Sequence, residues 1–508
     1  MLDSVQAPPR ARSHGVALCV ALCAAACSPS TDPTDNVDTD VAAAPRWPAC
    51  DPTATHQTVS FVHMNDMHGH YNIDDAGAAN VARIRGFFEQ VKAEQPFTLF
   101  TNGGDDYEKG SVVEPLSQYA ATSEISKAMK FDVRVIGNHD LSWSQDELLS
   151  YATDPSAIVL ASNIEYIGTD AQGFGAVEYA ELQVGCVKIG FIGAVSAPWT
   201  AENTQYEGDY YPEFPTDLDF VEVHRRLIAE HRADVDLLVA VSHLGVGDDE
   251  LVADQTDGLD VILGGHSHTP IFDLEDVGGT LIAQAGSYAQ YVARLDLDVD
   301  LTSRKIADHT YQLRLTTTDL PADVSTEAEV EAILNHYGPD AFTEIGQIEQ
   351  GVTKLGASKL AALGAIEDLG VDAAIMKQSA AFAGIKAGEL TQQKLFEAFL
   401  IERQPPGTPG WTATYTASIS GADLARMSEL DPNEWAVVLP SSIDPSATYR
   451  IALQKYAASV PANYLPAGVT IRATEFAKET WEVLDAYARS RTAACKFLDS
   501  DARLPTCP

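Results

Sequence analysis

Five short segments of the sequence carry the side chains best suited to holding metal ions. Each segment contains Asp, Asn or His, and each ends or follows an apolar run. The segments are Asp66-Met67-His68, Gly103-Gly104-Asp105, Gly137-Asn138-His139-Asp140, Ser242-His243 and Gly264-Gly265-His266-Ser267-His268. Because parallel strands end at one edge of a sheet, one sheet could bring all five segments together. Carboxylate, amide and imidazole groups would then surround a shared metal site.

Each segment taken alone has an ordinary structural explanation. Asp66 and His68 are two residues apart, so on extended backbone both side chains point the same way and can reach one ion. Polar residues also end strands that bind nothing. Asp105 follows two glycines, and its neighbour Asp106 is an alternative ligand. A single histidine at a strand end, such as His243, is more often structural than metal-binding. The coincidence of five such segments favours a metal site.

Apolar runs and helical patterns alternate between about His56 and Leu315. Ala79–Gln95 and Phe220–Ala233 have apolar residues at helical spacing. Strands are predicted at Thr58–Met64, Phe97–Asn102, Val133–Gly137, Cys186–Gly193, Leu237–Ser242 and Val261–Gly264. This alternation indicates a largely parallel, layered α/β domain whose polar strand ends form the site.

The ordered set of motifs resembles the calcineurin-like metallophosphoesterase superfamily, and most of all its bacterial 5'-nucleotidase and 2',3'-cyclic-nucleotide phosphodiesterase family. The resemblance rests on Asn65–Gly69, Gly104-Asp105, Gly137–Asp140, Ser242–Gly245, Gly264–Thr269 and Gln284–Tyr288. It implies a four-layer α/β metallophosphoesterase sandwich with two central sheets over residues 56–318. It also implies a smaller α+β C-terminal domain of the 5'-nucleotidase type over residues 338–508, and residues 319–337 are predicted to be a linking helix.

The resemblance assigns roles to the site residues, with two divalent ions as cofactors. The first ion would be held by Asp66, His68, Asp105 and His268. The second would be held by Asp105, Asn138, His243 and His266. Nitrogen and oxygen ligands without thiolate suit zinc, manganese, iron or cobalt. Two ions roughly 3.5–4 Å apart would activate a bridging hydroxide for in-line attack on phosphorus. The catalytic residue would be His139, which would stabilise the transferred phosphoryl group or protonate the leaving oxygen.

Two positions near the site depart from the family's pattern. The family usually has an Asp three residues after the catalytic histidine to orient it, and this sequence has Ser142 there. The nearest substitutes in sequence are Asp140 and Asp146. In the second motif Asp106 lies four residues before Gly110, which fits the family's spacing. Asp105 is nevertheless the predicted bridging ligand, because it directly follows the glycine pair at the strand end.

The C-terminal region resembles the family's substrate-binding domain through Gly388–Thr391, Ile419–Leu424 and Thr448–Ala452. An ungapped count back from Gly388 places Phe382 where the family has an arginine that would hold a phosphate or carboxylate. Other residues that could supply a charge or stack on a base are Lys377, Lys386, Arg403 and Tyr456, although each is also an ordinary surface or core residue. Helices are predicted at Ser358–Leu369, Gln392–Leu400 and Ala473–Arg489, and strands at Trp411–Ser420 and Tyr449–Leu453.

The N-terminus has the features of an export signal. Arg10 and Arg12 precede an apolar run that ends at Ala26 and is too short to span a bilayer. Residues 1–27 are therefore predicted to be a signal peptide, with Cys27 as a lipoprotein cysteine; cleavage without lipidation is the alternative. Residues 28–55 are predicted to be a disordered acidic tether. The expected location is the periplasm or cell envelope, with a lipid anchor in the outer membrane if Cys27 is lipidated.

Charge and cysteine content narrow the partners. The formal net charge of −40 in 508 residues excludes polymeric nucleic acid as a partner, because such binding depends on cationic contacts to phosphate. Small anions remain suitable, since bound metal ions reverse the local field. Four cysteines follow Cys27 and could form two disulfides in an exported protein. The four are Cys50, Cys186, Cys495 and Cys507, and three pairings are possible; Cys495 with Cys507 is favoured because both lie in the C-terminal tail.

These features predict an exported dinuclear-metal phosphoester hydrolase of the 5'-nucleotidase type, acting on a small phosphoester such as a nucleotide. One alternative is a metal-dependent hydrolase of a non-nucleotide ester, for example a sulfur ester. Another is a binding lipoprotein with little turnover, which the departures at Ser142 and Phe382 would allow. The presence of all seven expected metal ligands argues against this last alternative.

Overall fold

The computed structural model describes residues 46–71, 81–140, 150–164, 176–196, 219–317, 319–400, 409–410 and 412–505. The predicted signal peptide with Cys27, together with Ser142, Asp146, Arg403 and Cys507, lies outside these residues. The chain divides into Met1–Arg46 and Trp47–Pro508, and the helices and strands described below belong to the second unit. None of the helices in the described ranges has both the length and the apolar character needed to cross a bilayer.

The first sheet contains three of the strands that precede predicted site residues. Its strand order is β12-β11-β1-β2-β3-β4. The strands are β1 (His56–Met64), β2 (Thr98–Asn102), β3 (Val133–Val135), β4 (Ile158–Leu160), β11 (Tyr291–Asp300) and β12 (Lys305–Leu315). The neighbours from β1 to β4 are parallel, whereas β11 and β12 pair antiparallel at one side.

The second sheet contains the remaining two such strands. Its order is β5-β6-β7-β8-β10-β9. The strands are β5 (Tyr179–Val184), β6 (Val187–Ile192), β7 (Leu237–Val241), β8 (Val261–Gly264), β9 (Glu275–Val277) and β10 (Thr280–Gln284). The four central strands are parallel and both edge strands are antiparallel. One sheet could in principle have delivered all five segments, but two sheets deliver them, as the family resemblance implied.

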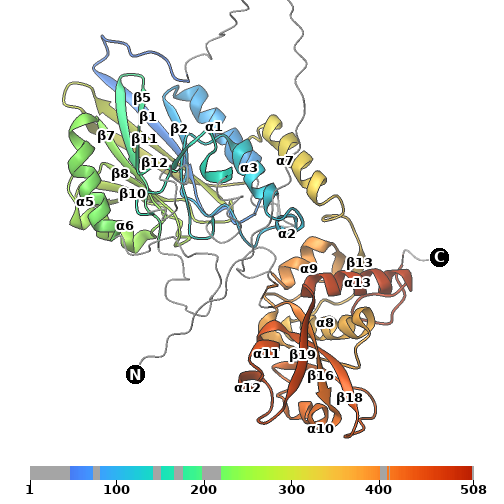
Figure 1. Cartoon of the computed structure of the whole chain (residues 1–508). Helices are drawn as coiled ribbons and strands as arrows, with labels where there is room; N and C mark the ends of the chain where they lie inside the picture. The colour runs from blue at the N-terminus through green and yellow to red at the C-terminus, as the bar shows by residue number, and fades with distance from the viewer. Residues whose placement is uncertain are drawn as a thin grey trace, which may run out of the picture. The chain divides into compact units, whose positions relative to one another are not determined.

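The two sheets pack face to face with helices outside them, which confirms the four-layer sandwich. Side chains such as Phe61 of β1 and Val239 of β7 share the inner core between the sheets. The helices are α1 (Val81–Glu94), α2 (Val113–Leu116), α3 (Ala120–Met129), α5 (Phe220–His231), the 3-10 turn η3 (Arg232–Asp234) and α6 (Val246–Gln255). Helices α1 and α3 cover the outer face of the first sheet, and α5 and α6 cover that of the second (Figure 1).

His63 ties the two sheets together beneath the predicted site. It is buried in β1, and its Nε2 donates to the carbonyl oxygen of Gly264 in β8 at 2.9 Å. Its Nδ1 accepts from the hydroxyl of Thr101 in β2 at 2.9 Å. Burial lowers the pKa of His63 to about 4, so the ring is neutral and needs no counter-ion. One side chain thus fixes the spacing of the sheets where their strands end.

The predicted linking helix forms as α7 (Val324–Tyr337), and it is also part of the first domain's outer layer. The Asp323 side chain caps its start by accepting the backbone N–H of Thr326 at 2.8 Å. Val330, Ile333 and Leu334 are buried in the same core as α1.

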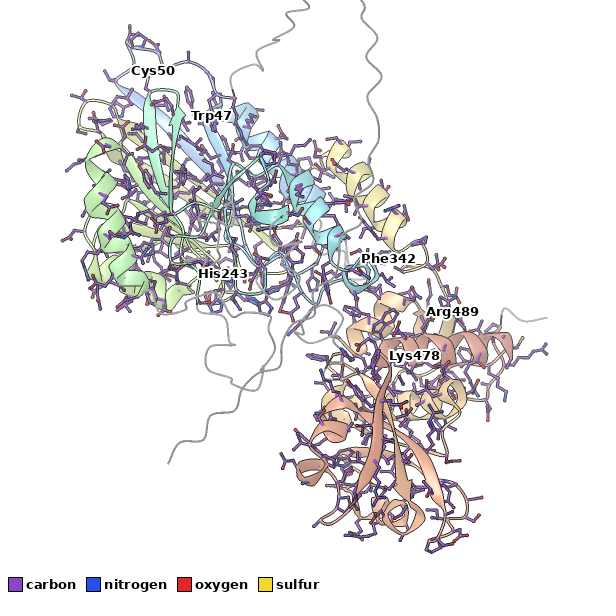
Figure 2. All side chains as sticks on the ribbon, in the orientation of Figure 1. Trp47, Cys50, His243, Phe342, Lys478 and Arg489 are labelled. Carbon is purple, nitrogen blue, oxygen red and sulfur yellow. A yellow bond between two sulfur atoms is a disulfide. The ribbon has the colours of Figure 1, made fainter. Side chains whose placement is uncertain are left out.

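The segment that leads into β1 is held to the first domain by two contacts. The Trp47 indole donates to the carbonyl oxygen of Thr98 at 3.0 Å, and Cys50 forms a disulfide with Cys186. Figure 2 shows Trp47 and Cys50 at the end of the domain opposite His243. The tether predicted for residues 28–55 is therefore too long at its C-terminal end. Cys495 is also disulfide-bonded, and its predicted partner lies outside the described residues.

The C-terminal part has the expected α+β composition. Its main sheet has the order β17-β14-β18-β16-β19, and β13 pairs separately with β15. The strands are β13 (Gly346–Ile348), β14 (Ala373–Lys377), β15 (Gly388–Leu390), β16 (Thr414–Ser420), β17 (Trp435–Val438), β18 (Thr448–Gln454) and β19 (Ile471–Lys478). The helices are α8 (Lys354–Leu369), α9 (Gln392–Ala398), α10 (Gly421–Ala425), α11 (Lys455–Ser459), α12 (Pro461–Tyr464) and α13 (Thr480–Ala493), with 3-10 turns η4 (Gln378–Ala380) and η5 (Arg426–Glu429).

The predicted helix at Ala473–Arg489 is wrong over its first half. Residues 471–478 form β19, which pairs antiparallel with β16. The helix begins only at Thr480, where Glu479 and Glu482 form a reciprocal capping box. Ala, Glu and Lys in this stretch favour a helix locally, but pairing with β16 overrides that preference.

Removal of the disulfide should destabilise the first domain. Replacing both cysteines (Cys50→Ala with Cys186→Ala) should lower the free energy of unfolding by about 2–4 kcal/mol, because the link joins residues 136 apart and restricts the unfolded chain. Urea unfolding followed by circular dichroism measures the change. An unchanged midpoint would mean that the other contacts of the segment, such as the Trp47 hydrogen bond, suffice to hold it.

Candidate metal centre

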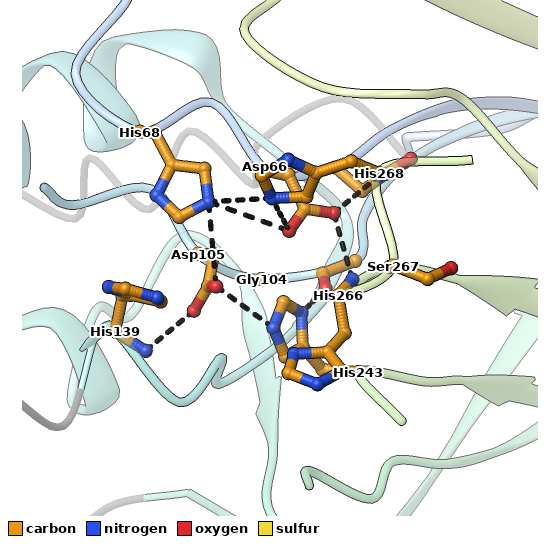
Figure 3. Close-up of polar contacts among 12 residues, drawn as sticks. Asp66, His68, Gly104, Asp105, His139, His243, His266, Ser267 and His268 are labelled. Carbon is orange, nitrogen blue, oxygen red and sulfur yellow. Dashed lines mark hydrogen bonds and ion pairs between the residues drawn. The ribbon is translucent and has the colours of Figure 1, made fainter. Parts of the chain in front are cut away.

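All seven predicted metal ligands and His139 follow the carboxyl ends of parallel strands from both sheets. The first sheet contributes Asp66 and His68 after β1, Asp105 after β2, and Asn138 and His139 after β3. The second contributes His243 after β7, and His266 and His268 after β8. Figure 3 shows the aspartates and histidines of this set converging on one place. The strand-end prediction is therefore right about position, although two sheets supply the residues.

Five of these residues have backbone conformations that side chains rarely adopt. Their φ angles are positive: Asp66 (52°), His68 (49°), Asp105 (57°), His266 (75°) and His268 (56°). Such conformations cost about 1–3 kcal/mol each and persist only where the surrounding structure imposes them. Their concentration in one place points to a functional centre, because folding alone would favour relaxed turns.

Asp66, His68 and His268 form the first candidate ligand group. The Nε2 atoms of the two histidines are 3.0 Å apart, and Asp66 Oδ1 lies 3.2 Å from His268 Nε2 and 3.7 Å from His68 Nε2. Asp66 Oδ1 is buried without a hydrogen-bond partner, while Oδ2 accepts the backbone N–H of His266 at 2.9 Å. A buried carboxylate oxygen facing two imidazole nitrogens is the arrangement that a cation would satisfy.

Asp105, His243 and His266 form the second group. Asp105 Oδ2 lies 3.0 Å from His243 Nε2. The amide oxygen of Asn138 lies 3.1 Å from His243 Nε2 and 2.9 Å from His266 Nδ1. The structure thus brings Asn138 into the second group, where the sequence prediction put it.

Asp105 joins the two groups, whereas Asp106 faces away from them. Asp105 Oδ2 also lies 3.6 Å from His68 Nε2, so one carboxylate reaches a histidine of each group. Its close packing requires Gly137, since a Cβ there would lie 2.1 Å from Asp105 Oδ1. The Asp106 carboxylate instead accepts hydrogen bonds from the side chains of Asn102, Ser126 and Tyr151.

Backbone carbonyl groups set which ring nitrogen of two histidines faces the centre. His68 Nδ1 donates to the carbonyl oxygen of Tyr107 at 2.9 Å, and His243 Nδ1 donates to that of Gly103 at 2.5 Å. In both rings Nε2 therefore turns inward, where it faces the other residues of the centre. This pattern of an outer hydrogen bond fixing the tautomer is typical of metal-binding histidines.

The pKa shifts at the centre show that its buried carboxylates are stabilised by positive charge. Burial raises the pKa of Asp66, but the facing imidazoles of His268 and His68 more than offset burial and hold the pKa well below its usual range. Burial also raises the pKa of Asp105, but nearby imidazoles, chiefly that of His243, outweigh burial. The pKa of Asp105 is therefore strongly lowered as well. Burial lowers the pKa of His243, but Asp105 outweighs it and raises the pKa to about 10.

The carboxylate that contacts the predicted catalytic histidine is one that sequence reasoning missed. Glu108 lies against Nδ1 of His139, and its side chain is fully buried. Asp140, a predicted substitute for the missing Asp, has both carboxylate oxygens occupied by backbone N–H groups. They belong to Gly137, Asp105, Asp106 and Tyr107. The sequence signal for Glu108 was slight, namely an acidic residue between Asp105 and Gly110.

Tyr288 is a second residue near the centre that the prediction did not single out as functional. Its ring centroid lies 5.2 Å from that of His268 and 4.6 Å from that of His70. Its backbone N–H donates to the carbonyl oxygen of Asp66 at 2.6 Å. The only sequence signal was its place at the end of the Gln284–Tyr288 motif.

In the C-terminal domain, Lys377 lies beside aromatic side chains. Its Nζ is 5.6 Å from the Trp435 ring centroid and 5.7 Å from that of Tyr464. The rings of Tyr464 and Tyr456 are 4.8 Å apart. Phe382, at the position of the family's arginine, is half-buried, and Lys386 is exposed. Lys377 thus lies among aromatic rings, and Phe382 leaves the expected arginine missing from the position that an ungapped count gives it.

Comparison with known proteins places the first domain in a family. Residues 59–270 match the family model for calcineurin-like phosphoesterases. The chain is 26% identical over 288 residues to the uncharacterized metallophosphoesterase YunD of Bacillus subtilis (strain 168), an alignment that covers 55% of this chain and 57% of YunD. It is 22% identical over 310 residues to human 5'-nucleotidase, covering 55% of this chain and 53% of that protein. The chain thus spans just over half the length of these relatives.

Solved structures match a larger share of the chain. The 5'-nucleotidase precursor from Thermus thermophilus superimposes with a TM-score of 0.60 at 20% identity, covering 85% of this chain and 96% of that one. The sulfate thiohydrolase SoxB of the same organism gives a TM-score of 0.57 at 16% identity, covering 85% and 94%. At these identities the likeness shows the fold. Residues 59–270 therefore carry the calcineurin-like phosphoesterase match, and the chain has the fold of the solved 5'-nucleotidase precursor.

Proposed function

We propose that this protein is a metal-dependent phosphoester hydrolase with two divalent ions, acting on nucleotides or related small phosphoesters in the manner of a 5'-nucleotidase. The observation that carries the proposal is the position of Asp105. Its carboxylate reaches His243 of one ligand group and His68 of the other, at 3.0 Å and 3.6 Å. Two groups that share one carboxylate suit a pair of adjacent ions better than a single ion.

The chain's residues divide the work as follows. Asp66, His68 and His268 would hold one ion with Asp105, and Asn138, His243 and His266 would hold the other. When bound, the ions would supply Lewis-acid stabilisation and a nucleophile for in-line attack on phosphorus. His139 would donate to the phosphoryl or leaving-group oxygen, and its backbone N–H already donates to Asp105 Oδ1 at 2.7 Å.

The substrate proposal rests on the relatives and on the charge of the site. Five of the seven proposed ligands are neutral or cationic, and bound ions would make the centre attractive to a phosphate despite the acidic surface. One observation favours a second candidate, hydrolysis of a non-nucleotide ester: Phe382 stands where the family's anion-holding arginine would be. Export to the periplasm or cell envelope, with lipidation of Cys27 as the anchor, is proposed from the N-terminal sequence.

Removal and return of metal should switch the activity off and on. Protein stripped with a chelator should hydrolyse nothing, and reloading with Mn²⁺ or Zn²⁺ should restore turnover with about two ions bound per chain. Elemental analysis counts the ions. A panel of adenosine 5'-monophosphate, a 2',3'-cyclic nucleotide, 4-nitrophenyl phosphate and a sulfate ester identifies the substrate class.

Three outcomes of this panel are decisive. Hydrolysis of the nucleotides supports the proposal, and turnover confined to the other esters supports the second candidate. No turnover by the reloaded protein with any phosphoester would reject the hydrolase proposal and favour a binding function.

Asp105 and Asp106 make a matched pair of variants. Asp105→Asn should lower kcat by more than about 100-fold and reduce the bound metal, because replacing a direct ligand costs more than disturbing an outer residue. Asp106→Asn should keep both ions but lower the free energy of unfolding by about 1–3 kcal/mol, because it disturbs three buried hydrogen bonds. Metal content, kcat and thermal unfolding are measured for both. Loss of metal in the Asp106 variant alone would reverse the assignment.

His139 should act on the chemical step and leave metal binding intact. His139→Ala should lower kcat by about 10²–10⁴-fold, the usual contribution of a positioned proton donor. Both ions should remain bound, since His139 is not among the proposed ligands. Steady-state kinetics and elemental analysis measure the two effects. An unchanged kcat would exclude a catalytic role.

A further inference from the structure

Glu108 is a buried carboxylate that none of the proposed roles uses. It is 1% exposed, and one of its oxygens, Oε1, has no hydrogen-bond partner. The other oxygen contacts Nδ1 of His139, whose side chain is 22% exposed. The carboxylate therefore lies behind the ring, and the ring itself reaches the accessible side of the centre. Keeping a half-satisfied carboxylate in the interior costs stability, so its presence calls for a function.

The contact fixes how the imidazole is presented. A carboxylate only accepts hydrogen bonds, so Nδ1 of His139 must carry the proton, and Nε2 lies on the side of the ring away from Glu108. The His139 ring meets the His68 ring edge-on, with centroids 4.9 Å apart, which places it beside the first ligand group. A carboxylate that holds one tautomer and one ring orientation is what a histidine acting on a leaving group needs.

The backbone around Glu108 is held in a costly conformation. Glu108 and Lys109 have φ angles of 87° and 88°, a region that residues with a Cβ seldom occupy. The next residue, Gly110, packs so tightly on the first motif that a Cβ would lie 2.4 Å from the carbonyl oxygen of His68. The loop after β2 therefore packs closely against the loop after β1, and the Glu108 side chain points into the protein interior.

Glu114 supports this conformation from beneath. Its Oε1 accepts the backbone N–H of Glu108 at 2.9 Å and the hydroxyl of Thr122 at 2.9 Å. Glu114 is itself 1% exposed. Its carboxylate also packs against Gly69, where a Cβ would lie 2.5 Å from Oε2. A buried carboxyl thus joins the loop of the first ligand motif to the loop that carries Glu108.

We propose that Glu108 is the positioning residue of His139, held in place by Glu114. It would do from the loop after β2 what the family's Asp does from a position three residues beyond the catalytic histidine, where this chain has Ser142. Ser142 would then mean that a carboxylate from another loop has taken over this role, and His139 would still be held in one orientation. This inference rests on the proposed phosphoester hydrolysis, in which His139 acts on the phosphoryl or leaving oxygen.

A double-mutant cycle between Glu108 and His139 tests the proposal in the full, metal-loaded chain. The variants are Glu108→Gln, His139→Ala and the two combined, with Glu108→Asp as the conservative replacement. Glu222→Gln is the control, since Glu222 makes an exposed ion pair with Arg225. The substrates are 4-nitrophenyl phosphate, which has a good leaving group, and adenosine 5'-monophosphate, which has a poor one. Metal content and thermal unfolding are measured for every variant.

The expected result has three parts. Glu108→Gln lowers kcat by about 10- to 100-fold at unchanged KM and unchanged metal content, the range typical of residues that orient a functional group. The double variant is no slower than His139→Ala, because Glu108 acts only through His139. Glu108→Asp recovers part of the lost kcat, and the loss in Glu108→Gln is larger for the substrate with the poorer leaving group.

Several outcomes would overturn the proposal. An unchanged kcat in Glu108→Gln would do so, as would losses that multiply in the double variant, which would show that Glu108 acts independently of His139. A Glu108→Gln variant that loses metal or fails to fold is replaced by Glu108→Asp in the cycle, where the same non-additivity is required. If the wild-type chain turned over no phosphoester, the proposed function itself would fail. An active wild type and an inactive His139→Ala variant with an unaffected Glu108→Gln variant would reject only this inference.

Discussion

Two buried carboxylates lie where the two sheets meet, and the structure around the site has to compensate their negative charge. Asp66 and Asp105 are 0% and 1% exposed. An ionised carboxylate removed from water costs several kcal/mol unless positive charge is supplied nearby. Here the charge comes from imidazoles, chiefly His268 and His68 for Asp66 and His243 for Asp105, and the pKa of each aspartate is lowered despite burial. The aspartates therefore hold the loops together. Their need for nearby positive charge also makes the site suitable for metal ions.

The sandwich architecture is what allows these loops to meet. Parallel strands from two sheets end at one seam, and His63 spans that seam through the Gly264 carbonyl oxygen. Hydrogen bonds from ring nitrogens to the carbonyl groups of Tyr107 and Gly103 then set the inward-facing nitrogen atoms. The positive φ angles at five site residues are maintained by this network. The strained backbone at these residues lowers the stability of the fold locally, and it holds the side chains in positions suited to binding a ligand.

The centre and its surroundings differ in how closely they follow the family's pattern. Every expected metal ligand is present, whereas the carboxylate beside His139 comes from a different loop. Many arrangements can orient a histidine, because the requirement is one acceptor at Nδ1. Two adjacent ions are more restrictive, since each needs several ligands at fixed distances. A centre for two ions therefore constrains its ligands more tightly than the groups around it.

Local sequence patterns are enough to identify the strands that lead to the site and the residues at their ends. Apolar runs followed by Asp, Asn or His are a local signal, because burial of the strand and exposure of its end are both encoded in neighbouring residues. Hence Asp66, Asp105 and His243 were correctly placed at strand ends. The start of α13 was misplaced because strand pairing, a long-range contact, overrode local helix preference in residues 471–478.

The sheet that each strand joins and the direction in which each side chain turns depend on contacts between distant parts of the chain. Periodicity is the same in either sheet, so two sheets could not be told from one without the family resemblance. Asp106 was separated from Asp105 by its hydrogen bonds to Ser126 and Tyr151, which come from other elements. Glu108 meets His139 across 31 residues of chain because β2 and β3 are neighbours in the sheet. Such contacts depend on strand order, and strand order is a property of the whole fold.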